Sequence, residues 1–267
     1  MLNIGAINWG SPINQASPLN RGLVSWWLAN GPTVGSVTWR DLCRRNDGTL
    51  TSMDPATDWV TAKRTGGVYS LDLDGSDYVQ LGDLPSGTFS ADFTFSAWVY
   101  PRALALATIF FCKRTGATAG IVIWHNSSVF STRIDATDCT GSALSTNVWQ
   151  HIVSARTGST VELYVNAVAQ SVTGNPNAND GSNTQPAVIG ARSFTTATNY
   201  LNGIIDDVRI WDRRLSPDEV SQLYTDSLTG YQQTLNRLQR RFAYSAAAPA
   251  TSVPAIMYHR RRLSGAR

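Results

Sequence analysis

Apolar and polar residues alternate along several short segments of the chain. In FTFSAWVYP at 93–101, every second residue from Phe93 to Val99 falls on one face of an extended strand. In VELYVN at 161–166, every second residue from Val161 is apolar, while the residues between are polar or aromatic. This period of two predicts strands with one face in a core and the other outside.

Residues 69–81 predict two strands joined by a tight turn. Apolar residues alternate over 69–73, and residues 78–81 resume an apolar pattern. Between them stands Asp-Gly-Ser-Asp at 74–77, in which Gly75 can adopt a positive φ. We expect this stretch to form a β-hairpin.

One helix is well marked. Residues 216–219 combine an N-cap Ser, a Pro at the first helical position and a Glu at the third, and an apolar stripe follows. We expect this helix to end near Gly230. Residues 235–242 carry the pattern of a second amphipathic helix, and the stretch after 245 is too poor in large apolar residues to fold alone.

The chain therefore divides into three parts. We expect residues 1–20 to form an extended N-terminal arm, residues 21–226 a β-sandwich, and residues 227–267 a C-terminal helix with an Arg-rich tail. With 42% hydrophobic residues, nine Trp and 21 Gly, the composition suits a β-rich fold with a large core and many turns. It excludes a collagen, a coiled coil and a wholly disordered chain.

Charge is unevenly distributed along the chain. Residues 1–230 hold all 19 acidic residues and 15 basic ones, a balance of −4, whereas residues 231–267 hold seven Arg and no acid. The net charge of +3 therefore describes a basic tail on a mildly acidic body. We expect no specific nucleic-acid partner for the body.

The three cysteines, Cys43, Cys112 and Cys139, are irregularly spaced and specify neither a disulfide framework nor a zinc site. We expect small buried thiols. The first residues lack the basic and apolar regions of a secretory signal. The longest strongly apolar run, 103–111, is too short to span a membrane. We therefore expect no export signal and no membrane anchor.

Taken in order, these segments resemble the laminin-G-like, concanavalin A-like jelly roll. This resemblance implies an all-β fold, a two-sheet antiparallel jelly-roll sandwich with a short C-terminal helix and extended terminal arms. The chain departs from the family at Asn166-Ala167, where Asp-Gly is usual, and at Arg44-Arg45, which interrupt the usual Gly-Asn. The matching stretches are GLVSWWL at 22–28, Asp41 with NDGTL at 46–50, LDLDGSDYV at 71–79, FTFSAWVYP at 93–101, WQHI at 149–152, VELYVN at 161–166 and NGIIDDVRIWDRRLSPDEV at 202–220.

By alternation, Asp206 shares the face of Ile204, Val208 and Ile210, the expected core face, so its carboxylate needs a partner. The family resemblance suggests a structural calcium ion, because members often hold one beside the corresponding Asp.

The suggested calcium ligands are Asp41, Asn46 and Asp206. In the alternative, Asp206 accepts backbone N–H bonds or pairs with an arginine, and the Arg44-Arg45 insertion favours this second interpretation.

Aromatic residues on the outward faces suggest a second kind of site. Trp98, Tyr100, Trp124 and Tyr164 lie opposite the core stripes, where flat rings could stack on sugars. In the alternative, the outer face is covered by the N-terminal arm, the C-terminal helix or a neighbouring subunit.

The sequence lacks the signature of an enzyme. Glycoside hydrolysis needs two positioned carboxylates, and the hydrolases of this superfamily resemble one another in a Glu-x-Asp-x-x-Glu strand. The chain has only two glutamates, Glu162, which stands alone, and Glu219, which belongs to the helix cap. The sequence contains no G-x-S-x-G elbow or phosphate-binding Gly loop. We expect no catalytic residues.

The leading functional hypothesis is a non-catalytic structural, decoration or adhesion protein of a phage virion. Laminin-G-like modules usually work outside cells, and a virion protein assembles in the cytoplasm and is released by lysis without an export signal. The layout also resembles phage proteins with a jelly roll between terminal extensions. The alternatives are a free-standing, extracellular bacterial carbohydrate-binding or adhesion module, and a glycan hydrolase.

In the virion hypothesis the terminal arms dock on capsid or tail proteins within an oligomeric assembly, and the sandwich is displayed outward to adhere to surface glycans. The residues expected to dock are Trp9, Arg260, Arg261 and Arg262.

Overall fold

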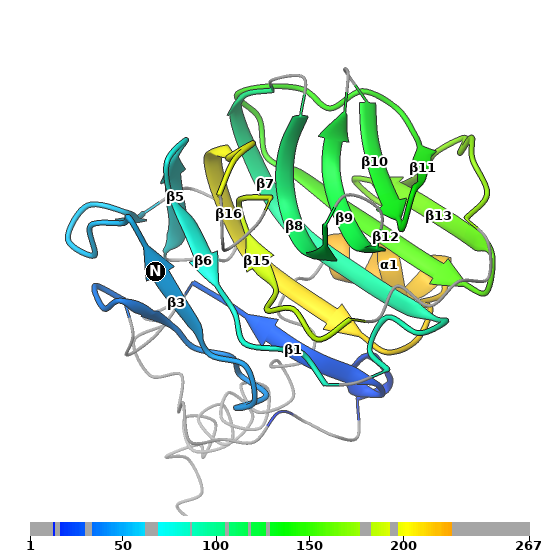
Figure 1. Ribbon diagram of the computed structural model, residues 1–267, viewed down its shortest axis with the longest axis horizontal. Coiled ribbons are helices and arrows are strands. Elements are labelled where there is room, and N and C mark those ends of the chain that lie inside the picture. Colours follow the sequence, from blue (N-terminus) through cyan, green and yellow to red (C-terminus); the bar gives the residue numbers. More distant parts are fainter. Residues whose placement is uncertain are drawn as a thin grey trace, which may run out of the picture. The chain divides into compact units, whose positions relative to one another are not determined.

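The computed structural model describes residue 13 and residues 17–29, 34–61, 69–85, 87–104, 107–116, 119–126, 129–176, 183–192 and 197–225. These residues form two antiparallel β-sheets packed face to face, with one short α-helix outside them (Figure 1). Among them, no helix combines the length and apolarity that a membrane crossing requires. The predicted all-β sandwich with a short helix after its last strand is therefore confirmed.

Sheet A is organised around β16. One edge of this strand pairs with β7, and the other edge pairs first with β5 and then with β1. The order across the sheet is β14-β13-β12-β7-β16-β5-β4. Its strands are β1 (Leu23–Trp27), β4 (Trp59–Val60), β5 (Ser70–Asp74), β7 (Phe93–Ala103), β12 (Gln150–Thr157), β13 (Thr160–Val165), β14 (Val168–Ala169) and β16 (Asn202–Trp211).

Sheet B lies in front of sheet A in the view of Figure 1. Its order is β11-β10-β9-β8-β15-β6-β3-β2. Its strands are β2 (Thr38–Trp39), β3 (Gly48–Thr51), β6 (Tyr78–Gln80), β8 (Ala107–Thr115), β9 (Ala119–Asn126), β10 (Val129–Ile134), β11 (Thr137–Thr140) and β15 (Val188–Ile189).

The main core fills the space between the sheets. Every second residue of β7 from Phe93 to Val99 is fully buried there, and Val161 and Leu163 of β13 are also buried. The alternation predicted at 93–101 and 161–166 is therefore confirmed. Sheet B contributes large side chains from β8, and the Phe111 ring lies 5.4 Å from that of Phe95 across the core. Burial of these apolar side chains is the main term that stabilises the sandwich.

The predicted hairpin at 69–81 is wrong. Strand β5 pairs with β16 and β4 in sheet A, whereas β6 pairs with β3 and β15 in sheet B. The turn at 74–77 therefore links the two layers and does not join paired neighbours. Leu73 and Val79 both face the core, but from opposite sheets. Alternation indicates which residues face the core, and it gives no information on which strand pairs with which.

The predicted face of β16 is wrong at its first residue. Ile204 is half-buried, and Ile205 lies in the core in its place. Val208 and Ile210 lie in the core as predicted. The pairing with β7 shifts between Asp206 and Arg209, and Asp207 has a φ of 52°. A β-bulge at this point adds a residue and reverses the alternation.

The helix α1 (Pro217–Thr225) covers part of the outer face of sheet A. Ser216 N donates to Glu219 Oε2 (2.9 Å) and Glu219 N donates to Ser216 Oγ (3.3 Å), so the predicted capping box is confirmed. Val220 and Leu223 pack against other buried side chains of this face, which include Val153, Tyr164 and Trp211. The predicted end near 230 and the helix at 235–242 lie outside the described residues.

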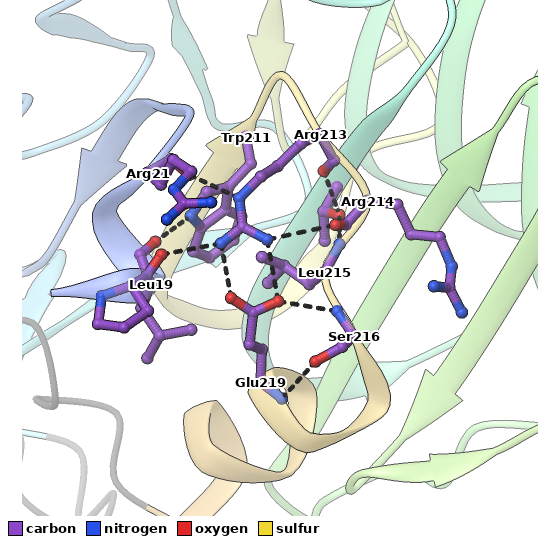
Figure 2. A network of polar contacts seen from close by, with 10 residues as sticks. Leu19, Arg21, Trp211, Arg213, Arg214, Leu215, Ser216 and Glu219 are labelled. Atoms are coloured by element: carbon purple, nitrogen blue, oxygen red, sulfur yellow. Dashed lines mark hydrogen bonds and ion pairs between the residues drawn. The ribbon is translucent and has the colours of Figure 1, made fainter.

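The segment before β1 is anchored beside α1. Instead of an extended arm, residues 18–20 form a 3-10 helix, η1 (Pro18–Asn20), and Leu19 is 1% exposed. Figure 2 shows how Trp211 and Arg213 hold this segment. Trp211 Nε1 donates to the Leu19 carbonyl (2.6 Å), and Arg213 donates to the Pro18 and Arg21 carbonyls (3.0 and 2.7 Å). Arg213 also forms an ion pair with Glu219 (2.7 Å), which links the segment to the helix.

Candidate functional site

The buried carboxylate of Asp41 organises the chain around the end of β1. Its Oδ1 accepts hydrogen bonds from Trp26 N (2.8 Å) and Cys43 N (2.9 Å), and its Oδ2 from Arg45 N (3.2 Å) and Asn46 N (3.1 Å). Burial raises the pKa of Asp41, while these four backbone hydrogen bonds act in the opposite direction.

The other two predicted calcium ligands also bind this region. Asp206 Oδ1 accepts Ala29 N (2.9 Å) and Asp207 N (2.7 Å). Asn46 donates from Nδ2 to Ser25 Oγ (2.7 Å). The structure thus brings the three residues around residues 25–29, as groups that hydrogen-bond this segment of the chain.

The donor set does not fit a calcium ion. A carboxylate offers about four lone-pair positions, and those of Asp41 accept four backbone N–H groups. Calcium takes six to eight oxygen ligands. In the described part of the chain, no group of three or more His, Cys, Asp or Glu side chains is arranged to hold a metal ion. The contacts match the alternative in which Asp206 accepts backbone N–H bonds.

The sequence did not point to Asp207, Arg209 and Trp26, which form a buried polar cluster beside this segment. Arg209 donates to Asp207 through Nε (2.8 Å) and Nη2 (3.1 Å), and its guanidinium lies 3.8 Å from the Trp26 ring centroid. Trp26 Nε1 also donates to Asp207 Oδ1 (2.7 Å). The side chains of Arg209 and Asp207 are only 1% and 4% exposed, so the cluster serves the fold and not a ligand.

The outward aromatics of sheet A are largely covered. Tyr164 is 4% exposed beneath α1, and its hydroxyl donates to Glu162 (2.8 Å). Trp98 is half-buried and stacks on Tyr224 of α1, with ring centroids 5.6 Å apart. Tyr100 is also half-buried, and its ring centroid lies 5.8 Å from that of Trp149. Tyr164 therefore offers no ring to a sugar, and Trp98 is partly occupied by the helix, as the alternative interpretation expected.

Trp124 lies on the outer face of the other sheet. It is half-buried against Ile109, Cys112 and Val122, and the guanidinium of Arg133 lies 4.7 Å from its ring centroid. The four predicted stacking residues are therefore split between opposite faces of the sandwich and do not form one aromatic groove. The sequence suggested that the Trp124 ring is open to a sugar, whereas in the structure the guanidinium of Arg133 lies over it.

The carboxylates that could act as acid-base pairs have partners within the fold. Glu162 and Glu219 are ion-paired with Arg214 and Arg213, each at 2.7 Å. Asp77 has a pKa raised to about 6, mainly by burial and then by the charge of Asp74, but it is 3% exposed and its Oδ2 accepts Asp74 N within the turn that follows β5. All of these carboxylates therefore have structural roles.

A hollow of about 410 Å³ opens beside the start of β1. Its lining includes Leu23, Leu42, Cys43 and the exposed Arg44 and Arg45, which make its rim basic. Burial raises the pKa of the Cys43 thiol to about 12, so the thiol is protonated at neutral pH and is a poor nucleophile.

The residues predicted to dock on partners, Trp9 and Arg260 to Arg262, lie outside the described residues.

Removing divalent cations should leave the fold unchanged. Because the Asp41 oxygens are occupied by backbone donors, we expect unfolding temperatures with EDTA and with millimolar CaCl2 to agree within about 1 °C. Differential scanning calorimetry measures both. A rise of several degrees with calcium that EDTA reverses would contradict this interpretation of the three residues.

Comparison of the structure with solved proteins shows where the same fold occurs. Domain 4 of AbnA, a GH43 extracellular arabinanase from Geobacillus stearothermophilus solved with arabinotriose, matches with a TM-score of 0.56 and 21% identity over 76% of this chain and 98% of that domain. The binding domain of Paraclostridial Mosquitocidal Protein 1 matches with a TM-score of 0.59 and 18% identity over 79% of this chain and 53% of that one.

Trypanosoma rangeli sialidase, solved with 2,3-difluorosialic acid as a covalent intermediate, matches with a TM-score of 0.59 and 14% identity over 79% of this chain. The chain spans about a third of that enzyme. At these identities the likeness establishes the fold alone.

The family is established by sequence. No curated protein sequence matches the chain significantly. The family model of the Concanavalin A-like lectin/glucanases superfamily, however, matches residues 73–221, which is more than half of the chain. The chain therefore belongs to the Concanavalin A-like lectin/glucanases superfamily.

Proposed function

We propose that this chain is a non-catalytic carbohydrate-binding or adhesion module. The superfamily includes both lectins and glucanases by its description. A structurally similar arabinanase domain was solved with arabinotriose, and another similar structure is described as the binding domain of its protein. These neighbours support binding as readily as hydrolysis, so the choice rests on the site chemistry of this chain.

The observation that carries the proposal is that both glutamates are held in ion pairs with arginines. Each forms an ion pair that ties together parts of the scaffold, Glu162 with Arg214 and Glu219 with Arg213. A glycosidase needs one carboxyl group to protonate the leaving oxygen and a second, about 5 to 9.5 Å away, to act as nucleophile or base. Glutamates engaged in this way are poorly placed for either role.

Binding without turnover is the expected result when the purified chain is tested against glycans. On a glycan array followed by titration calorimetry, at least one oligosaccharide should bind with a dissociation constant of about 1 mM or tighter. No new reducing ends should appear during prolonged incubation. Release of sugar that is abolished by one Asp or Glu replacement would refute the non-catalytic role, and an array without any binder would refute the glycan-binding role.

The second candidate is a structural or decoration protein of a phage virion, with its arms docked on capsid or tail proteins. The observation that favours it is the position of η1 and α1. Leu19, Val220 and Leu223 pack in one cluster on the outer face of sheet A. A domain held through this side would present the opposite face, that of sheet B, outward.

Deletion of residues 245–267 tests the virion role. We expect the truncated chain to keep the β-sheet circular dichroism of the full chain while losing incorporation into particles, because the tail supplies the docking contacts. Quantitative mass spectrometry of purified particles measures incorporation. A truncated chain incorporated as efficiently as the full chain would exclude docking through the tail.

A further inference from the structure

The outer face of sheet B carries a cluster of arginines. Across neighbouring strands, Cys112 of β8 pairs with Val122 of β9, which pairs with Arg133 of β10, which pairs with Asp138 of β11. This row points away from the core, because Ile121 and Ile123, which flank Val122 in sequence, are core residues. Arg133 and Asp138 therefore stand on the outside of the sheet.

Arg133 is fixed in its orientation. It donates to Asp138 through Nε (2.7 Å) and Nη2 (2.6 Å), and its guanidinium lies over Trp124. The Trp124 ring is itself held against the buried side chains of Ile109, Cys112 and Val122. The Nε–Nη2 edge of Arg133 is thus taken by Asp138, and its fixed guanidinium is preorganised to offer Nη1 to an anion.

Arg114 belongs to the same face, two residues after Cys112 on β8. It lies opposite Gly120 of β9 and is half-buried. Its Nη2 is buried and has no hydrogen-bond partner. Burial lowers the pKa of Arg114, and the charges of Arg192 and Arg133 lower it further.

Arg192 completes the cluster. The Cys112 thiol donates to the Arg192 carbonyl, which holds the backbone of Arg192 beside β8. The Arg192 side chain is exposed.

Charge on this face is not balanced. Arg133 is bound to the one carboxylate of this row, Asp138, while Arg114 two residues beyond Cys112 and Arg192, held beside β8 by its backbone, add two further positive charges. Two other acids close by in the fold have contacts of their own, since Asp83 pairs with Lys113 (2.6 Å) and Asp135 accepts Gly120 N (2.9 Å). A partly buried cation without a counter-ion is costly, and an anionic ligand would compensate it.

We propose that the arginine face, defined as Arg114, Arg133 and Arg192, binds the carboxylate of an acidic sugar. This inference rests on the proposed glycan-binding function and names its ligand class. A carboxylate matches the planar, forked donors of arginine. A nucleic acid is disfavoured because it needs a long basic stripe, and the first 230 residues carry more acidic than basic side chains.

The test measures binding of the full chain to sialyllactose, oligogalacturonate and hyaluronan oligosaccharides, each beside its carboxyl-reduced or neutral counterpart. We expect at least one acidic member to bind about tenfold more tightly than its counterpart. Arg114→Gln and Arg192→Gln should each weaken this binding severalfold or more. The matched control is Arg40→Gln, which removes the same charge from an exposed arginine beyond the far edge of sheet B, next to β2.

Stability separates a binding role from a structural one. Because Arg114 is partly buried and its Nη2 has no hydrogen-bond partner, Arg114→Gln should unfold at the same temperature as the parent chain or higher. A loss of several degrees would show that Arg114 is held for the fold and would overturn its role in binding. Arg192→Gln, at an exposed position, keeps the test independent of folding.

Each outcome distinguishes the two proposals. Equal binding of acidic and neutral sugars, or unchanged affinity in both arginine variants, would overturn the acidic-sugar inference while leaving glycan binding intact. Polyaspartate that competes as well as the acidic sugar would overturn the assignment of a sugar. Absence of binding to any sugar, acidic or neutral, would overturn the proposed function together with this inference.

Discussion

The sandwich depends on buried polar groups that attach β1 to the rest of sheet A. Trp26 donates its backbone N–H to the carboxylate of Asp41 and its indole N–H to that of Asp207. Its ring lies against the guanidinium of Arg209. Asp206 binds the chain three residues later, at Ala29. Buried charges are stabilising only when their partners are all in place, so this arrangement fixes a single register for β1 against β16.

Because β16 is shared by β1, β5 and β7, that register fixes the layout of the module. The segment before β1 is carried to the edge of α1, where Arg213 and Trp211 bind it (Figure 2). One outer face of the sandwich is thereby devoted to anchoring the helix and the N-terminal segment. The arginine face lies on the opposite sheet, separated from these contacts by the core. A division into an anchored face and a presented face suits a binding or displayed module.

The sequence predicted those features that depend on neighbours in sequence. The alternation at 93–101 and 161–166 and the capping box at 216–219 were predictable because each is a short-range pattern. The orientation of Ile204, away from the core, could not be predicted from the sequence. A β-bulge inserts a residue into β16, and no sequence signal is strong enough to locate it.

The candidate sites were harder to predict because they join distant residues. The contact between Trp26 and Asp207 spans 181 positions, so alternation could not assign the carboxylate a partner. The covering of Tyr164 by α1 requires knowing which sheet face the helix packs on. Arg114 and Arg133 become neighbours only through the registers of β8, β9 and β10. The sequence predicted that Trp124 lies on an outer face, but only the structure shows that arginines surround it.

A double-mutant cycle on Asp207 and Arg209 tests the central claim most directly, with stability measured by chemical denaturation. We predict that Asp207→Asn and Arg209→Met each lower the free energy of unfolding by about 3 kcal/mol, because each leaves its partner buried without compensation. The double variant should lose less than the sum of the two, by at least about 1 kcal/mol. Additive losses, or single losses below about 0.5 kcal/mol, would contradict the claim that the buried pair contacted by Trp26 of β1 stabilises the fold.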